Sequence, residues 1–270
     1  MDGARAARVT RFAEGEAHIG EDRVAHEEPL EIQLGAHSLA VVMRTPGHDE
    51  ELALGFLVTE RVVSALEEVE AVRHCSVVPD PESEDNVIRV TLREGVAVDL
   101  ERLRRNLLVS SSCGVCGKAT IENAMGQAPP LDDPARFPAG FFAGLPDQVR
   151  ARQAGFEQTG GLHAAALFSP KGELLVVRED VGRHNAVDKV VGWAVLERRL
   201  PLAGHVLLVS GRVSYEIVQK ALAARLPVVA AVSAPTSLAV ELAEQSGITL
   251  VAFLRGKRFG VYGMRERVVG

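Results

Sequence analysis

Two cysteines three positions apart are the residues of this chain best suited to covalent chemistry. Cys113 and Cys116 stand within Ser110-Ser111-Ser112-Cys113-Gly114-Val115-Cys116-Gly117-Lys118, where small residues cannot fill an apolar core. Lys118 is close by and the residues after it have helical character, so a thiol here should have a lowered pKa and react as the thiolate. Such a pair could bind one metal ion, exchange through a mixed disulfide, or accept and pass on sulfur.

A zinc site would need further ligands, and the sequence supplies them weakly. No second CxxC pair is present, and the third cysteine, Cys75, lies between valine-rich segments as a buried, inert thiol would. His48-Asp49-Glu50 spells the H-x-E of zinc deaminases, but Ser112 stands where a proline precedes their cysteine pair. A zinc-dependent, deaminase-like hydrolase that uses His48 and Glu50 with Cys113 and Cys116 is the alternative to a sulfur carrier.

The last ninety residues predict a parallel sheet covered by helices. Apolar strands are expected at 205–209, 228–232 and 248–253, and amphipathic helices at 185–197, 214–224 and 237–245. Strands that alternate with helices through short loops indicate right-handed βαβ units.

Small or basic residues follow each of these strands. They are Ser210, Gly211 and Arg212 after the first, Ser233, Ala234, Pro235, Thr236 and Ser237 after the second, and Arg255, Gly256, Lys257 and Arg258 after the third. Each loop alone could be an ordinary helix cap or a solvated turn. Because ligands bind beyond the carboxyl ends of parallel strands, the three loops together predict a pocket for a phosphate-bearing anion. The sequence has neither a GxGxxG nor a Walker A pattern.

A second dense cluster is Glu179-Asp180-Val181-Gly182-Arg183-His184-Asn185-Ala186-Val187-Asp188-Lys189. One interpretation is structural: Asp180 caps a helix and Arg183 is its ion-pair partner. The other is functional: Arg183, His184 and Lys189 add positive charge to the anion pocket or orient the substrate of a thiol. The cluster alone does not decide between them.

The rest of the chain predicts an organisation in four parts. These are an N-terminal arm or edge strand (1–28), a β-rich portion with one helix and the CxxC loop (29–125), a proline-rich loop or linker (126–144) and an α/β portion (145–270), with the whole allowed to be one continuous domain. Within them we expect strands at 30–34, 38–44, 69–78, 86–92, 162–168 and 173–177, and helices from residue 48 and around 147–154.

Composition limits the classes of function. The 270 residues are 47% hydrophobic, with a formal net charge of -6 and a sequence pI of about 5.8, which speaks against a general nucleic-acid binder. No apolar run is long enough to span a bilayer, and the first residues do not form a secretory signal. With only three cysteines, a disulfide framework is not expected, and we expect a cytoplasmic protein.

Several motifs, in order, resemble those of the formate dehydrogenase accessory sulfurtransferases, the FdhD family. They are Thr45-Pro46-Gly47, the CxxC run from Ser111 to Lys118, the cluster at 179–189, Ser210-Gly211-Arg212, Ala231-Val232-Ser233-Ala234-Pro235-Thr236-Ser237 and Phe253-Leu254-Arg255-Gly256. The resemblance extends from about residue 30 to the C-terminus. It implies a cytidine-deaminase-like α/β core, with a mixed or parallel sheet flanked by helices, that lacks deaminase activity and forms a homodimer.

The resemblance also implies an activity. A family member takes persulfide sulfur from a cysteine desulfurase and delivers it to the molybdenum or tungsten bis(guanine dinucleotide) molybdopterin cofactor that formate dehydrogenase needs. Cys113 is similar to the persulfide-forming cysteine and Cys116 to its partner. The segment Phe253, Leu254, Arg255, Gly256, Lys257 and Arg258 matches the one used for the cofactor. With Ser210, Arg212, Ser233, Thr236, Ser237, Arg183 and His184 it makes up the expected pocket, for which GDP would be a mimic. No tightly bound metal of the protein's own is expected.

Overall fold

The computed structural model describes residues 3–75, 85–99 and 129–270. Cys113 and Cys116 therefore lie outside the described residues, as do the residues of helical character that follow Lys118. No helix in the described part of the chain is long and apolar enough to cross a bilayer.

The N-terminal portion contains a four-stranded sheet and one helix. The sheet has the order β4-β3-β6-β5, formed by β3 (Glu28–Leu34), β4 (His37–Arg44), β5 (Val69–His74) and β6 (Val87–Leu92). Alternate residues of β3, Leu30, Ile32 and Leu34, are buried beneath α1 (Asp49–Thr59), as a half-buried strand requires. The short 3₁₀ helix η1 (Leu66–Glu68) leads into β5. The strands expected at 30–34 and 38–44 and the helix expected from residue 48 are confirmed.

The C-terminal portion contains a six-stranded mixed sheet with the order β13-β12-β11-β10-β8-β9. Its strands are β8 (His163–Phe168), β9 (Leu174–Asp180), β10 (Val206–Val209), β11 (Val228–Ala231), β12 (Thr249–Arg255) and β13 (Arg258–Gly263). The central strands β10, β11 and β12 are parallel, as predicted, while β8, β9 and β13 extend the sheet in antiparallel fashion. The α/β fold class is confirmed.

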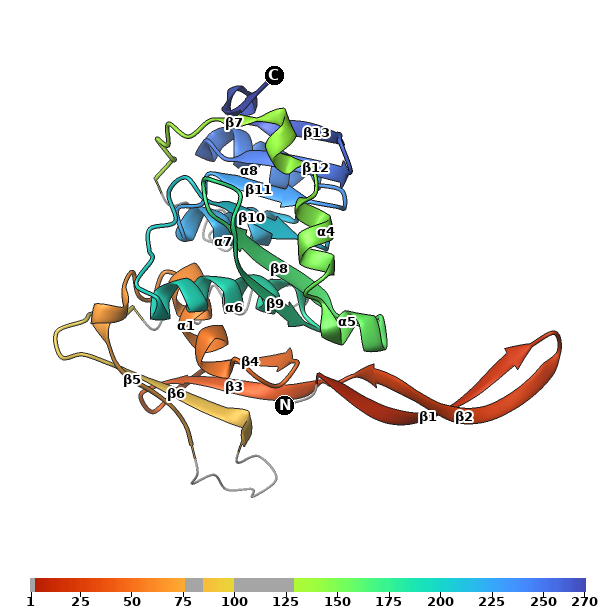
Figure 1. The fold of residues 1–270 in the computed structure, drawn as a ribbon. Helices are drawn as coiled ribbons and strands as arrows, with labels where there is room; N and C mark the ends of the chain where they lie inside the picture. The colour runs from red at the N-terminus through yellow and green to blue at the C-terminus, as the bar shows by residue number, and fades with distance from the viewer. Residues whose placement is uncertain (1–2, 76–84, 100–128) are drawn as a thin grey trace.

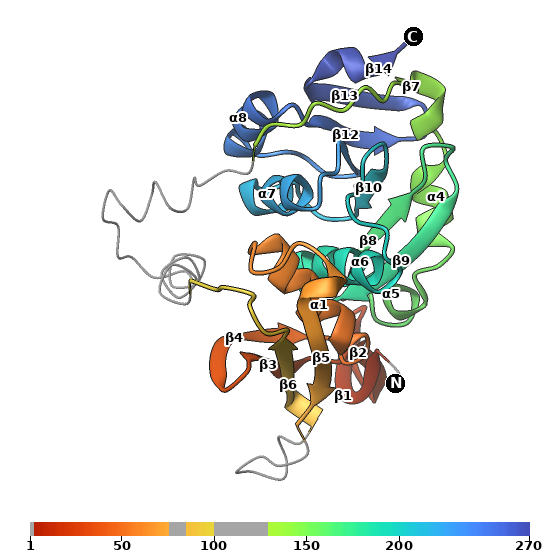
Figure 2. The same cartoon turned by 90° about the vertical axis from the view of Figure 1, so that its left-hand side faces the viewer.

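Both faces of this sheet are buried. Helices α6 (Arg183–Leu196), α7 (Tyr215–Ala223) and α8 (Ser237–Ser246) pack against one face, and Figure 2 shows α7 and α8 on the side opposite α4. The other face is covered by β7 (Phe137–Pro138), η3 (Ala139–Phe142) and α4 (Leu145–Arg150). The helix expected around 147–154 is divided into α4 and α5 (Ala154–Thr159).

The segment interpreted as a loop or linker contributes side chains to the core. Phe137 and Phe142 are 2% and 0% exposed, and β7 pairs with β14 (Val268–Val269), which follows the short η4 (Arg265–Arg267). Residues 137–142 are thus a packed layer on the sheet, and the domain boundary placed between 126 and 144 stays a prediction.

The two portions are joined by close packing of α1 on α6. A Cβ atom on Gly55 would lie 1.8 Å from the carbonyl oxygen of Asp188, and one on Gly192 would lie 1.7 Å from that of Glu51. Glycine is therefore required at both positions, because any side chain would force the helices apart. One continuous apolar cluster includes residues of α1, α6 and both sheets.

The N-terminal arm is a two-stranded ribbon that projects from the body (Figure 1). It consists of β1 (Ala4–Ala13) and β2 (Glu16–Ala25), paired antiparallel along their whole length. Near its tip, Phe12 and Ile19 are 77% and 83% exposed. At its root, an Arg5–Glu28 ion pair of 2.6 Å holds the ribbon to β3.

Candidate cofactor-binding site

The polar loops of the C-terminal portion meet at one edge of the six-stranded sheet. The parallel strands β10, β11 and β12 end there. Because β8 and β13 run antiparallel to their neighbours, both strands begin at this edge, and β9 ends there with Asp180 opposite His163. The carboxyl ends of the parallel strands thus lie beside the beginning of α6 and its Arg183 and His184, which is the arrangement that the functional interpretation of the 179–189 cluster requires.

A pocket of about 600 Å³ opens at this edge between the sheet, α4 and α5. Ser210 and Val232, from the ends of β10 and β11, line it together with His163, Gln153 and Phe156. The Ser210 hydroxyl accepts a hydrogen bond from the Ala164 N–H at 2.9 Å. Most of the other residues that line this pocket lie between 146 and 163, in or beside α4, α5 and β8. No site residue was predicted in that stretch.

Gly211 brings Arg183 next to this pocket. A Cβ atom on Gly211 would lie 3.4 Å from His163 Nδ1 and 3.5 Å from Arg183 Cβ, so the three residues are in contact distance. Arg183 Nε is buried and has no hydrogen-bond partner in the described part of the chain. Arg183 is half-buried, so its guanidinium brings positive charge to this edge, which favours an oxyanion there.

The loops after β10 and β11 are tied to each other. The Val213 N–H donates to the Ala234 carbonyl at 3.1 Å, and the Thr236 N–H donates to the Val213 carbonyl at 3.0 Å. The Thr236 hydroxyl accepts from the Ala239 N–H at 3.3 Å and so caps α8, whose first residue is Ser237. Thr236 therefore has the structural role that the capping interpretation gave it, while Arg212 is exposed and Ser233 is half-buried.

The end of β12 and the turn that follows it continue the same edge. The Phe253 N–H donates to the Ser233 carbonyl at 3.1 Å, and Phe253 itself has a positive φ of 56°, which turns its ring outward to 46% exposure. Leu254 is fully buried in the core. Beyond it, Arg255 stands opposite Arg258 across a tight turn at Gly256.

The basic turn itself borders a second pocket, of about 650 Å³. Lys257, Arg258 and Phe259 line it on one side, and Ala139, Gly140 and Ala143 line it on the other. Arg255, Lys257 and Arg258 are all exposed, and within the described residues none of them forms an ion pair with a carboxylate. Their charge is therefore available to a ligand.

Two histidines add neutral donors and acceptors to the site. Burial, together with Lys220 and Arg183, lowers the pKa of His184 to about 4. Burial, and then Arg183, also lowers the pKa of His163. His184 Nε2 lies 3.3 Å from the Ser214 hydroxyl at the beginning of α7. Near neutral pH the positive charge of this corner therefore comes from Arg183, because Lys220 is ion-paired with the buried Asp188 at 2.8 Å.

Asp180 and Lys189 form a buried ion pair beneath the site, which corrects one sequence interpretation. Lys189 Nζ lies 2.7 Å from Asp180 Oδ2 and donates to the Thr45 carbonyl at 2.8 Å. Asp180 also accepts from the N–H groups of Thr45 and Gly182. The partner of Asp180 is thus Lys189 rather than Arg183, and Lys189 holds the Thr45-Pro46-Gly47 turn instead of facing a ligand.

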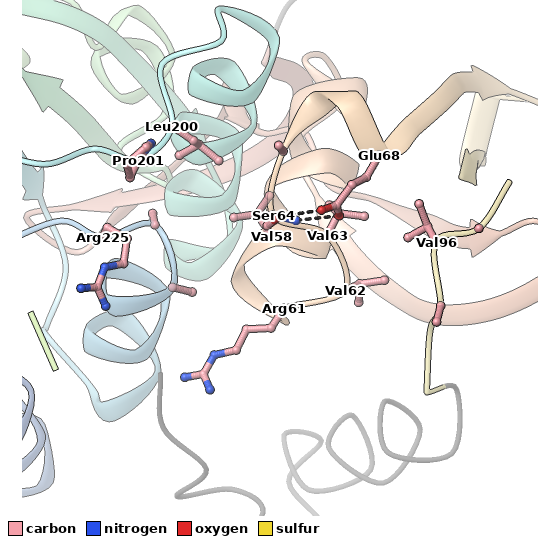
Figure 3. A pocket seen from close by; sticks show the side chains of 15 residues that line it. Val58, Arg61, Val62, Val63, Ser64, Glu68, Val96, Leu200, Pro201 and Arg225 are labelled. Atoms are coloured by element: carbon pink, nitrogen blue, oxygen red, sulfur yellow. Dashed lines mark hydrogen bonds between the residues drawn. The ribbon is translucent and has the colours of Figure 1, made fainter. Parts of the chain in front are cut away.

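The opposite, amino edge of the sheet has a different pocket, of about 860 Å³ (Figure 3). It lies between the ends of α1 and α7, beside Leu200 and Pro201 and residues 95–97, and its lining is largely apolar with Arg61 and Arg225 at the rim. Arg225 donates to the carbonyls of Pro129 and Pro130 at 2.6 and 3.3 Å. The described residues on either side of 100–128 therefore border this pocket.

The zinc alternative gains no support from the described residues. His48 is 3.5 Å from Glu51, which an ion pair with Arg178 already holds. Among the described residues, no group of three or more His, Cys, Asp or Glu side chains could hold a metal ion. The cysteine pair lies outside them, so a test of the hydrolase hypothesis requires elemental analysis of the purified protein. Cys75 is a half-buried free thiol.

Comparison with known proteins gives the family. The profile of the FdhD/NarQ family matches residues 25–269. The chain belongs to the FdhD/NarQ family. It is 50% identical over 264 residues to the sulfur carrier protein FdhD of Mycolicibacterium paratuberculosis, with 97% of each chain covered. It is 43% identical over 263 residues to that of Saccharolobus solfataricus, with 96% of each chain covered.

A solved structure resembles the whole fold. The crystal structure of a formate dehydrogenase accessory protein from Desulfotalea psychrophila superimposes with a TM-score of 0.76 and 26% identity, covering 98% of this chain and 99% of the other. The family resemblance inferred from the motifs is thus confirmed. The structural similarity covers nearly the whole chain and so extends to the N-terminal ribbon, which lies mostly outside the family profile.

Proposed function

We propose that Cys113 of this FdhD/NarQ protein accepts sulfur from a cysteine desulfurase. The protein then delivers that sulfur to the molybdenum or tungsten bis(guanine dinucleotide) cofactor of formate dehydrogenase. The observation that carries the proposal is the carboxyl-edge site, where Arg255, Lys257 and Arg258 are exposed, have no carboxylate partner within the described residues, and suit the phosphates of a guanine dinucleotide. The names of the relatives, sulfur carrier and formate dehydrogenase accessory protein, support the direction of the transfer.

Loading of Cys113 would be a thiolate exchange. The Cys113 thiolate attacks the outer sulfur of the desulfurase persulfide, a new S–S bond forms on Cys113, and the desulfurase thiolate leaves. The sulfane sulfur moves without net oxidation or reduction.

Delivery of that sulfur as sulfide takes two electrons, and Cys116 can supply them. Its thiolate attacks the inner sulfur, closes a Cys113–Cys116 disulfide and releases hydrosulfide, which replaces a ligand on the cofactor metal. A cellular dithiol then reduces the disulfide by exchange.

The length of the cysteine-bearing segment permits transfer between the two edges of the sheet. Cys113 is 14 residues beyond Asp99 and 16 residues before Pro129. Fourteen extended residues reach up to about 46 Å. By comparison, the 14 residues of α6, which runs from the carboxyl edge to the amino edge, are about 21 Å long. A sulfur atom on Cys113 is therefore within reach of either edge.

The proposal includes a homodimer acting in the cytoplasm. The cofactor carries two guanine nucleotides, and each chain would contribute one carboxyl-edge site to hold one of them. The reducing cytoplasm keeps both thiols available for exchange.

Loading is tested by incubating the purified protein with a cysteine desulfurase and cysteine, followed by mass spectrometry of its peptides. We expect the added mass of one sulfur atom on Cys113, and none on Cys75. The absence of a persulfide from both Cys113 and Cys116 would contradict the mechanism.

Elemental analysis of the same preparation distinguishes the sulfur carrier from the alternative, a zinc hydrolase that uses His48, Glu50 and the cysteine pair. Stoichiometric, tightly bound zinc would favour the hydrolase. A metal-free protein that still forms the persulfide supports the carrier.

A further inference from the structure

We propose that the N-terminal arm binds a second copy of this chain, with Phe12 and Ile19 at its tip packed on Val41 and Met43 of that copy. The contact is reciprocal, so each chain both gives an arm and receives one. This inference rests on the proposed function for the homodimer alone, and it adds the surface through which the two chains meet. Neither surface belongs to the carboxyl edge or to the pocket at the amino edge.

The arm has too little packing of its own. Of its two ten-residue strands, β1 buries only Ala4 at the root, and β2 buries no residue. A two-stranded hairpin alone in water is marginally stable, because it has no second layer on which to bury side chains. Its exposed strand edges also favour contact with another chain. The arm of an isolated chain therefore lacks the surface that would stabilise it.

One face of the arm carries the apolar side chains of the tip. The antiparallel register places Phe12 opposite Ala17, and Ile19 two residues farther along β2. Because alternate residues of paired strands share a face, the exposed Phe12 and Ile19 side chains are diagonal neighbours. Arg8 lies on the same face, nearer the root, and forms no ion pair with any described residue. The face thus combines an apolar tip with one free cation.

A matching surface lies on the outer face of the four-stranded sheet. Val41 and Met43 of the edge strand β4 are 64% and 50% exposed. Val42 between them packs on the core, so the two exposed side chains point away from it. Val41 lies opposite Glu31 of β3, which forms no ion pair within the described residues. Apart from the arm, no other strand of the described chain exposes two large apolar side chains on one face.

The positions of the two surfaces select a second copy as the partner. Met43 lies at the root of the arm, because the next residue, Arg44, contacts Glu28, as Arg5 of the root does. The tip is about 30 Å from the root, and the arm runs away from β3 and β4 (Figure 1). A chain therefore cannot place its own tip on its own β4. In a two-fold pair with antiparallel arms, the tip of each arm meets the root of the other, and both contacts form together.

The charges of the two surfaces are complementary. Arg8 is the free cation beside the apolar tip, and Glu31 is the free carboxylate beside Val41. Opposite charges on facing surfaces favour the correct partner and register. Two-fold symmetry forms the Arg8–Glu31 pair twice in each dimer, whereas an uncharged apolar partner would leave both groups unpaired.

The first test measures the dimer dissociation constant of the full-length protein by analytical ultracentrifugation. We expect the wild type to dimerise, and Phe12→Asp and Val41→Asp each to raise the constant at least a hundredfold. In both variants a carboxylate faces an apolar surface twice in each dimer. Val24→Asp, an exposed position on the other face of the arm, is the matched control and should leave the constant unchanged.

A charge exchange tests whether the contact lies between chains. Arg8→Glu and Glu31→Arg should each raise the dissociation constant about tenfold, because like charges then face each other twice in the dimer. A mixture of the two variants should recover the wild-type affinity, since both contacts of the mixed dimer pair opposite charges. Failure of the mixture to recover would overturn the reciprocal contact. Arg93→Glu, an exposed arginine outside both surfaces, is the control.

The possible failures are distinguishable. A wild type that stays monomeric would overturn both this contact and the homodimer of the proposed function. A dimer that neither Phe12→Asp nor Val41→Asp weakens would overturn the contact and leave the homodimer to another surface. Weakening by Phe12→Asp alone would overturn the assignment of β4 as the receiving surface.

Persulfide loading of Cys113, measured on the same samples, reports the sulfur-carrier role separately. We expect Phe12→Asp to be loaded like the wild type. If that variant still dimerises but is not loaded, the arm binds the desulfurase rather than a second copy, and the proposal is wrong.

Discussion

The two edges of the six-stranded sheet use their cations differently. At the carboxyl edge Arg255, Lys257 and Arg258 are exposed and form no ion pair within the described chain. At the amino edge the guanidinium of Arg267 is 1% exposed and donates to the carbonyls of Gly247, Pro227 and Asp133. The described cations of the first edge are therefore exposed and without a carboxylate partner, whereas Arg267 at the second edge holds the chain together.

The direction of the parallel strands explains this difference. Helices begin after the carboxyl ends of the strands, so free N–H groups and the positive ends of the helix dipoles gather there. At the amino edge helices end, and Arg267 donates there to the carbonyl of Gly247 at the end of α8, while its other acceptors and those of Arg225 are loop carbonyls. The comparison predicts that substitutions at the amino edge change stability and that substitutions at the carboxyl edge change affinity.

The largest effect is expected from Arg267→Met. It removes buried hydrogen bonds to three carbonyls and to the Thr249 hydroxyl. We expect a loss of about 3 kcal/mol in the free energy of unfolding, measured by urea titration. Arg265→Met, an exposed neighbour, should change it little. A fall in GDP affinity of the folded Arg267→Met protein, without loss of stability, would break the comparison.

A smaller and opposite pattern is expected from Arg255→Ala. The proposed function gives its exposed guanidinium a role in ligand binding rather than in folding, so we expect GDP affinity to fall about tenfold while the urea midpoint is unchanged. Arg225→Ala is the matched control at the other edge and should leave GDP affinity as it is. Equal losses in both variants would mean that GDP binding does not distinguish the two edges.

The smallest effect concerns pH. The pKa of His184 is lowered to about 4, chiefly by burial, and its ordinary value is 6.5. Between these values the unfolded chain binds the proton more readily, so this residue's contribution to stability is complete above pH 6.5 and is lost as pH falls toward 4. Urea unfolding from pH 7 to pH 4 should show a steeper loss for the wild type than for His184→Gln. Identical slopes would contradict this assignment.

Local patterns predicted the central part of the fold well. Strands β10 and β11 are short apolar runs between helices, and both were located to within one residue. β13 was not predicted, because Arg258-Phe259-Gly260-Val261-Tyr262-Gly263 contains two glycines and little alternation, and its pairing with β12 determines the strand. Phe137 and Phe142 were placed in a linker because four prolines surround them, whereas tertiary packing buries both rings.

The site was only partly predictable for a related reason. Ser210, Arg212, Ser233 and Arg255 follow apolar strands, so the topology of a parallel sheet places them at one edge. His163, Gln153 and Phe156 reach the same pocket through the packing of α5 and an antiparallel strand, for which no local pattern exists. The sequence also did not predict that Asp180 pairs with Lys189 rather than with Arg183. That pairing depends on the three-dimensional packing of α6 against the Thr45 turn.

The central claim, that this chain carries sulfur on Cys113 for formate dehydrogenase, is tested most directly by complementation. Cells that lack their own carrier of this family would receive the wild type, Cys113→Ala or Cys75→Ala, and formate dehydrogenase activity would be measured in extracts. We predict that the wild type and Cys75→Ala restore activity and that Cys113→Ala does not. Full restoration by Cys113→Ala would show that the protein only holds the cofactor, and would contradict the account.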